Sequence, residues 1–357
     1  MHGIVYVDKE GNAISPLYTW QDERGNRVYK NDETYVQYLS RLSGYKLASG
    51  YGLVTHFYNM VNDLVPNGAV KLCTIHDYIS MALSGETTPV TDCTDAASLG
   101  FFDVRNKCFD TCALAEHGFD ISLLPEIREG VTGCYRDNCD ISVCVAIGDN
   151  QASFLGATGG ERNSILINVG TGSQFSVYTE SYAECDGLET RPFPGSGYLV
   201  VGASLCGGRA YALLENFYRC IAKAFCGNID SYYDIMNKFL EMGGRPKDIP
   251  EIVPLFQGTR ENPDLRGSIT NLSADNFTPV HMTWAMLEGM AKELYDMYRK
   301  YRAEADVSDK KLVGSGNGLR KNMHFQKIVS DCFEIPLNMS DCEEEAAVGA
   351  AIYAASI

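Results

Sequence analysis

Hydrophobic positions along the chain recur with two periods, one typical of strands and one typical of helices. Alternation with a period of two predicts a strand over 3–8, and a β-branched run predicts a buried strand over 141–147. Two more strand-like segments, 164–169 and 174–179, are separated by a glycine-rich tip and therefore predict a hairpin. A further short strand is expected over 311–313.

Helices are predicted between these strands. The segment from about 31 to 83 has helical character with polar joints, and 209–225 forms a second helical stretch. A long helix should begin at Thr278-Pro279, because threonine is a good cap and proline fits the first helical position. The segment Ser340-Asp341-Cys342-Glu343 has the pattern of a capping box and predicts the start of the last helix.

The length of the chain sets the number of domains. Its 357 residues are enough for two ordinary domains, and a hydrophobic content of 45% with 21% charged residues is that of a soluble globular protein. Residues 157–161 are small, polar and rich in glycine, which favours a domain boundary there. We therefore expect one domain over 1–158 and a second over 159–357.

The net charge and the cysteine positions narrow the possible ligands and cellular locations of the protein. A formal net charge of -16 argues against nonspecific binding of nucleic acid, although backbone N–H groups can still bind an anion. We find no bilayer-spanning apolar run and no signal segment, so we expect no membrane association and a cytoplasmic location. Among thirteen cysteines, the regularly spaced Cys134, Cys139 and Cys144 have no histidine nearby, so free thiols are expected and no metal site is predicted.

Asp149 is the candidate catalytic residue. It follows the strand-like run in Gly148-Asp149-Asn150-Gln151-Ala152-Ser153, so its carboxylate should lie at a strand end beside a helix N-terminus. A carboxylate there can accept a proton from a hydroxyl that attacks a phosphoryl group. The alternative is that Asp149 merely caps the following helix, which is the more common role of such a residue taken alone.

Two glycine-rich segments favour the catalytic interpretation. The hairpin tip offers backbone N–H groups and hydroxyls to phosphate, through Gly170, Thr171, Gly172 and Ser173. A second turn runs into a helix and offers a slot for a nucleotide, formed by Gly314, Ser315, Gly316 and Asn317. It matches neither the dinucleotide pattern nor a Walker loop. Either segment could also be an ordinary turn, with Asn317 as a cap.

These motifs together resemble those of the FGGY carbohydrate kinases. Within that family the resemblance is greatest to bacterial sedoheptulokinase-like members, with xylulokinases as near relatives. The resemblance runs from the first residue to the last helix and rests on five motifs in order. They are Met1-His2-Gly3, Thr19-Trp20-Gln21-Asp22, the Asp149 motif, Asn168-Val169-Gly170-Thr171-Gly172-Ser173 with the following 203–211, and Gly314-Ser315-Gly316-Asn317-Gly318.

The resemblance implies a fold and an activity. The fold would be α/β, with two actin-like, ribonuclease-H-like domains around a cleft. The activity would be phosphorylation of a sugar hydroxyl by ATP with Mg²⁺, on a ketose such as sedoheptulose or xylulose. Asp149 would be the general base; Met1, His2, Trp20, Asp22 and Asp149 would contact the sugar. Residues 170–173 and 314–317 would bind ATP, and a homodimer is common in the family.

One family element has no counterpart in the sequence. Family members begin with an Asp-x-Gly-Thr-Thr hairpin, whereas this chain begins inside a later motif. We therefore expect an incomplete first domain and an unpaired strand edge at Gly3 to Asp8. The chain would be a fragment, a product of an internal start, or a relic.

Three functions are therefore open. The leading one is a sugar kinase with Asp149 as base. The second is a non-catalytic nucleotide- or sugar-binding remnant of the same fold, which the missing hairpin favours and Asp149 opposes. The third, a filament-forming actin-like protein, shares the fold but needs neither Asp149 nor the polar loop at 19–24.

Overall fold

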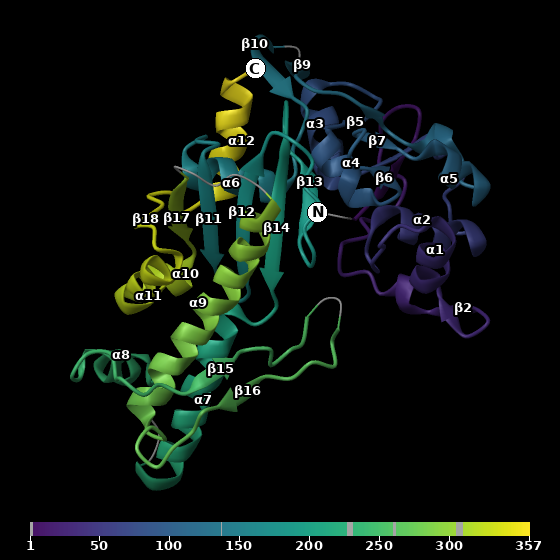
Figure 1. Cartoon of the computed structure of the whole chain (residues 1–357). Helices are drawn as coiled ribbons and strands as arrows, with labels where there is room; N and C mark the ends of the chain where they lie inside the picture. Colours follow the sequence, from purple (N-terminus) through teal and green to yellow (C-terminus); the bar gives the residue numbers. More distant parts are fainter. Residues whose placement is uncertain (1–2, 137, 227–230, 260–261, 305–309) are drawn as a thin grey trace.

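The structure, a computed structural model, describes residues 3–136, 138–226, 231–259, 262–304 and 310–357. Met1 and His2, two predicted sugar contacts, lie outside these residues. The N-terminal helices and short strands form one lobe, and a large sheet with its covering helices forms the other (Figure 1).

A six-stranded sheet is the centre of the second lobe. In spatial order its strands are β13 (Glu189–Pro192), β14 (Tyr198–Ser204), β12 (Ser173–Thr179), β11 (Ser164–Val169), β17 (Lys311–Ser315) and β18 (Leu337–Met339). β11, β17 and β18 are parallel to one another, whereas β12 is antiparallel to both of its neighbours, β11 and β14. The predicted hairpin is confirmed, with Val169 opposite Ser173 and a three-residue tip between them.

Helices cover both faces of this sheet, which explains why β11 is an almost continuous apolar run. One face packs against α7 (Gly207–Cys226), α9 (Pro279–Glu304) and α11 (Met323–Phe333). The other packs against α6 (Asp149–Thr158) and α12 (Glu345–Ala355). Alternate side chains of β11 point to opposite faces: Ile165 and Ile167 join the first cluster and Leu166 the second.

Helix α9 begins at Pro279, as predicted from the Thr278-Pro279 pair. One side of this helix is buried, from Trp284 and Leu287 through Ala291 to Leu294 and Tyr298. Figure 1 shows this helix crossing the sheet diagonally, with α7 and α8 (Tyr233–Glu241) extending beyond it.

The first lobe is built from short elements around an aromatic core. Its helices are α1 (Tyr35–Ser43), α2 (Gly52–Val61), α3 (Ile75–Ser84), α4 (Cys93–Leu99) and α5 (Thr111–Glu116). Its paired strands are β1 (Val5–Val7) with β4 (Lys71–Cys73), β2 (Val28–Lys30) with β3 (Glu33–Thr34), β5 (Val90–Thr91) with β8 (Glu126–Ile127), β6 (Phe102–Asp103) with β7 (Cys108–Phe109), and β9 (Val131–Tyr135) with β10 (Asn138–Cys144). In the described residues of this lobe, every sheet has only two strands.

The prediction of an unpaired edge at Gly3 to Asp8 is wrong. β1 pairs with β4 on one side, and Ile4, Tyr6 and Asp8 exchange backbone hydrogen bonds with residues 12–18 on the other. Because both edges are occupied, Ile4 and Tyr6 are fully buried.

Two further elements differ from expectation. The run 141–147 is a strand only as far as Cys144, where β10 pairs with β9 at the surface and leaves Ile141 half exposed. The last helix begins at Glu345 with Glu344 as N-cap, not at Ser340. The reason is that the Ser340 N–H donates to Gly314 and prolongs the β17–β18 pairing.

Two glycines bring α6 and α12 into direct backbone contact. A Cβ on Gly156 would lie 1.9 Å from the carbonyl oxygen of Glu345, and one on Gly349 would lie 1.7 Å from that of Ala152. No larger residue fits either position without separating the helices. The glycines therefore fix α6 against the sheet lobe.

We predict that Gly349→Ala destabilises the protein, although alanine is the better helix former by about 1 kcal/mol. The new methyl group would overpack the crossing, at a cost of about 1–3 kcal/mol in the free energy of unfolding. Urea denaturation measures the change, with Ala350→Leu at the exposed neighbouring position as a control expected to have little effect. A Gly349→Ala protein more stable than its parent would contradict this account.

Candidate active site

A cleft of about 2640 Å³ lies between the two lobes. Both contribute to its walls. Trp20 and Thr94 come from the first lobe. In the second lobe, Val201 and Ala203 lie on β14, and Leu205 directly follows it. Ligand pockets of roughly 300–1,000 Å³ are usual, so this cleft has room for more than one small molecule. Of the predicted site residues, Trp20 and Asp149 line it.

Asp149 is the first residue of α6 and is exposed to the cleft. The N-cap of that helix is Gly148, which provides no capping side chain, so the alternative of Asp149 as N-cap does not hold. The buried Gly148 N–H donates to Thr94 Oγ1 at 2.8 Å, and Thr94 belongs to α4 of the other lobe. The turn that carries Asp149 is thus tied across the two lobes.

The residues after Asp149 are tied to β13. Arg191 donates to Asn150 Oδ1 at 3.3 Å, and Gln151 donates to the carbonyl oxygen of Pro192 at 2.8 Å. Gln151 is buried, whereas the carboxylate of Asp149 faces the cleft. The helix start is therefore rigid while its acidic side chain remains accessible.

A histidine close to Asp149 has a perturbed pKa. His76 Nδ1 lies 3.0 Å from Oδ2 of the fully buried Asp95. The hydrogen bond to Asp95 raises the pKa of His76, and the negative charge of Asp149 adds to the shift. The protonated imidazole is thereby favoured; its contribution to stability is full below the ordinary histidine pKa of about 6.5 and is lost as the pH rises through the raised value.

The predicted sugar contacts have different environments. Trp20 is 55% exposed and lines the cleft, so its ring is free to cover a ligand. Asp22 instead pairs with Arg24 at 2.7 Å, and both side chains are mostly buried. Arg24 in turn lies 4.3 Å from the centre of the Tyr18 ring. Asp22 therefore holds the loop in shape, and it is absent from the described residues that line the cleft.

The hairpin tip at 170–173 packs on the start of α7. The Gly208 N–H donates to the Gly170 carbonyl, and the Arg209 N–H donates to that of Thr171. A Cβ at Gly207 would lie 2.3 Å from the backbone of Gly172. By contrast, nothing lies closer than 4.0 Å to a Cβ at Gly170. The tip is thus held from behind, with open space above Gly170; Gly170 and Thr171 are exposed and Ser173 is buried.

The second glycine-rich turn lies against the end of β11. Gly316 has a φ of +83° and a Cβ there would lie 2.5 Å from the carbonyl oxygen of Val169. Gly314 and Ser315 are buried within β17, while Asn317 is exposed at the start of α10 (Asn317–Arg320). Only the later half of this turn is therefore open to a ligand.

A polar network that the sequence did not reveal joins the two glycine-rich turns. Asn168 Nδ2 lies 2.8 Å from Ser315 Oγ and 3.3 Å from Glu345 Oε2. Burial raises the pKa of Glu345, while hydrogen bonds from Ser315 and Asn168 and the charge of Arg320 oppose the shift. The three glutamates at 343–345 are typical of a helix start. No local pattern indicated that Glu345 would contact Asn168, which lies 177 residues away in the sequence.

The structure thus brings the predicted residues together in two groups. Asp149 and Trp20 line the cleft, and the two glycine-rich turns meet at the ends of β11 and β17. The turns are not among the described residues that line the cleft. The hairpin tip is linked to the cleft through β14, because Ser173 pairs with Ser204. The neighbours of Ser204, Ala203 and Leu205, form part of the cleft wall.

Comparison with solved structures supports the two-lobed arrangement. A xylulose kinase from Rhodospirillum rubrum matches with a TM-score of 0.78 at 19% identity, over 99% of this chain and 73% of that one. The predicted class, a two-domain α/β fold of the actin-like ATPase type, is confirmed.

Sequence comparisons give the family. The C-terminal domain of the FGGY family of carbohydrate kinases matches residues 165–357, and its N-terminal domain matches residues 1–160. This chain belongs to that family. Sedoheptulokinases of Mus musculus and Homo sapiens are each 27% identical to it, over 96% of this chain and 74% and 73% of their own lengths.

Family membership gives the class of enzyme, and the structure adds a finding on membrane spans. The chain is a carbohydrate kinase, a class that uses ATP and usually a divalent metal and acts on small sugar substrates. No helix in the described ranges has an apolar stretch sufficient to cross a bilayer.

We predict that Thr94→Val lowers the free energy of unfolding by about 1–3 kcal/mol, because the buried Gly148 N–H loses its acceptor. Thr94→Ser keeps the hydroxyl and should restore most of the stability. Urea denaturation of both variants provides the measurement. If valine and serine were equally stable at this position, the hydrogen bond would contribute nothing.

Proposed function

We propose that this protein transfers the γ-phosphoryl group of ATP to a hydroxyl of a ketose sugar, with Asp149 as general base. The observation that carries the proposal is the accessible carboxylate of Asp149 at the start of α6, facing the cleft between the lobes. A base must be within hydrogen-bond reach of the proton that it removes, and a cleft-facing carboxylate meets that requirement for a sugar held there.

In this proposal Asp149 accepts the hydroxyl proton as the sugar oxygen attacks the phosphorus, and the bond to the leaving ADP breaks. The helix N-terminus favours a negative charge at this position, so the carboxylate is ready to accept a proton. The ties of Gly148 to Thr94 and of Gln151 to Pro192 support the proposal, because positioning provides much of the catalysis in phosphoryl transfer.

We propose the tip 170–173 as the phosphate contact and Gly316 with Asn317 as the ledge for the nucleoside. The open space above Gly170 is a cradle that a side chain would fill, which fits a backbone that approaches phosphate closely. Mg²⁺ fits a site of this kind because it is usually held by phosphate oxygens and one or two carboxylates. When bound with ATP it would neutralise charge on the transferred group.

We propose sedoheptulose and xylulose as the first sugars to test. The curated relatives reported above are sedoheptulokinases, and the structural match is to a xylulose kinase. The exposed ring of Trp20 offers an apolar surface for the carbon skeleton of such a sugar. The roles of Met1, His2 and Asp22, the domain boundary at 158, a cytoplasmic location and a homodimer stay predictions.

We predict that Asp149→Asn reduces kcat by about 10²–10⁴-fold while ATP affinity is unchanged, because the amide cannot accept the proton. A coupled assay of ADP release with each ketose gives the rate, and calorimetry gives the affinity. Asp186→Asn, another acidic position lining the cleft, is the matched control and should keep the parent rate.

Two outcomes would reject parts of this proposal. Turnover by Asp149→Asn close to that of the parent would reject the base. A parent protein that binds ATP but phosphorylates no ketose would favour the non-catalytic binding protein instead.

We predict that Gly170→Val raises the KM for ATP at least about tenfold, equivalent to about 1.4 kcal/mol of binding. The side chain would enter the open space above the tip, because nothing lies closer than 4.0 Å to a Cβ at this position. Gly170→Ala should have a smaller effect, and neither variant should change the thermal midpoint. An unchanged KM for ATP in a folded valine variant would exclude the tip as the phosphate contact.

A further inference from the structure

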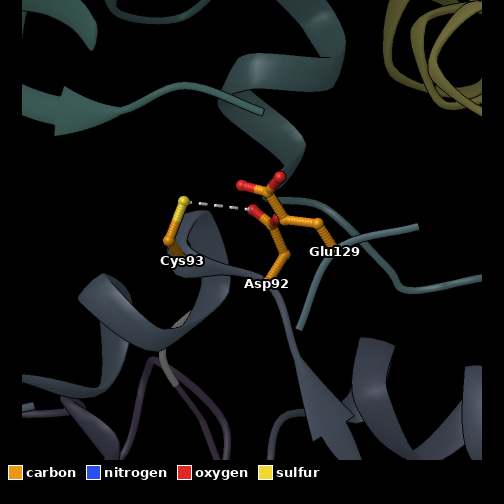
Figure 2. A group of neighbouring side chains, drawn as sticks. All are labelled: Asp92, Cys93 and Glu129. Carbon is orange, nitrogen blue, oxygen red and sulfur yellow. Dashed lines mark hydrogen bonds between the residues drawn. The ribbon is translucent and has the colours of Figure 1, made fainter. Parts of the chain in front are cut away.

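Three side chains of types that ligate metals meet in the first lobe, and none of them has been assigned a role above. Asp92 and Cys93 directly follow β5, and Glu129 lies just beyond β8. These strands are parallel, with Thr91 opposite Ile127, so their carboxyl ends bring the three side chains to one place. Figure 2 shows the thiol of Cys93 turned toward the carboxylate of Asp92, with the carboxylate of Glu129 beside it.

The distances suit a single ion. One ligand atom from each of Asp92, Cys93 and Glu129 lies within 4.8 Å of the other two. Zinc bonds of about 2.0–2.3 Å in a tetrahedron place ligand atoms roughly 3.5 Å apart. The three ligand atoms would therefore need to move only slightly closer together. The exposed, flexible side chain of Glu129 can provide this movement.

Asp92 supplies a second, independent observation. Its side chain is fully buried, and Oδ1 accepts the Thr94 N–H at 2.8 Å and caps α4. Its other oxygen, Oδ2, is buried without any hydrogen-bond partner among the described residues. A buried carboxylate oxygen without a partner is costly, and a bound cation would supply the missing partner.

Within the described part of the chain, the carboxylates of Asp92 and Glu129 have no countercharge at contact distance. The ion pairs of the described residues include neither Asp92 nor Glu129. A cation between Asp92 and Glu129 would provide a countercharge to both carboxylates.

We propose that Asp92, Cys93 and Glu129 form a binding site for a divalent cation of the zinc type. One thiolate and two carboxylates are a ligand set that zinc accepts, whereas Mg²⁺ and Ca²⁺ prefer oxygen alone. Three protein ligands leave the fourth position to water. Sequence spacing did not predict this site, because its ligands do not form one of the cysteine and histidine patterns by which zinc sites are recognised.

The site has a defined chemical requirement. Burial raises the pKa of the Cys93 thiol, so binding of the metal must displace a proton from sulfur. Lys107 adds a weaker favourable charge.

The bound ion would also stabilise the turn before Asp149. Asp92 Oδ1 accepts from Thr94, and Thr94 Oγ1 accepts from Gly148. A cation on the opposite oxygen of Asp92 would fix this chain of hydrogen bonds. In this proposal the ion supports the turn before Asp149, and its ligands are not among the residues proposed to bind ATP.

Titration of the whole, metal-free protein with Co²⁺ tests the proposal without reference to kinase activity. We expect one equivalent to give a thiolate-to-cobalt charge-transfer band, which Zn²⁺ displaces. Cys93→Ser should lose the band. Glu129→Gln should keep it but weaken Co²⁺ binding at least about tenfold, in line with the effect of removing groups that support a metal site.

One control variant separates this site from the other thiols. Cys112→Ser, at an exposed position on α5, should titrate like the parent. Because Cys93 is buried and its substitution could disturb folding, Glu129→Gln at the exposed position is the decisive variant. A parent that binds no Co²⁺, a band that survives in Cys93→Ser, or unchanged affinity in Glu129→Gln would overturn the proposal.

Discussion

The crossing of α6 and α12 is the constraint on which the rest of the structure depends. With glycine at 156 and 349, the helix backbones touch, and α6 lies flat on the buried sheet. That position directs the start of α6 toward the cleft, where Asp149 is exposed. A single close packing contact thus sets the geometry of the residue that we propose as base, without any contact to that residue itself.

The sequence predicted elements whose signals are local. The hairpin over 164–179 and the start of α9 at Pro279 follow from alternation and from capping preferences within a few residues. The sequence could not predict contacts between positions that are far apart along the chain, such as Thr94 with Gly148 or Asn168 with Glu345. Where a local signal competed with a tertiary contact, as at Ser340, the tertiary contact prevailed.

The same distinction applies within the candidate site. The two glycine-rich turns were recognisable as motifs, but the sequence could not say which members face outward. Ser315 proves to be buried and bonded to Asn168, while Gly170 and Asn317 are exposed. Asp22 likewise forms an internal pair with Arg24. Residues that share a motif therefore divide into those that hold the fold and those that remain available to a ligand.

The hydrogen bond between Gly148 and Thr94 has a consequence for motion. Helix α6 is fastened along its length to the second lobe, yet its leading end is fastened to the first. The helix therefore links the two lobes beside the cleft, which residues 148–151 line. A motion that separates the lobes must bend α6 or break the hydrogen bond between Gly148 and Thr94. The width of the cleft and the orientation of the acid at position 149 are thereby coupled.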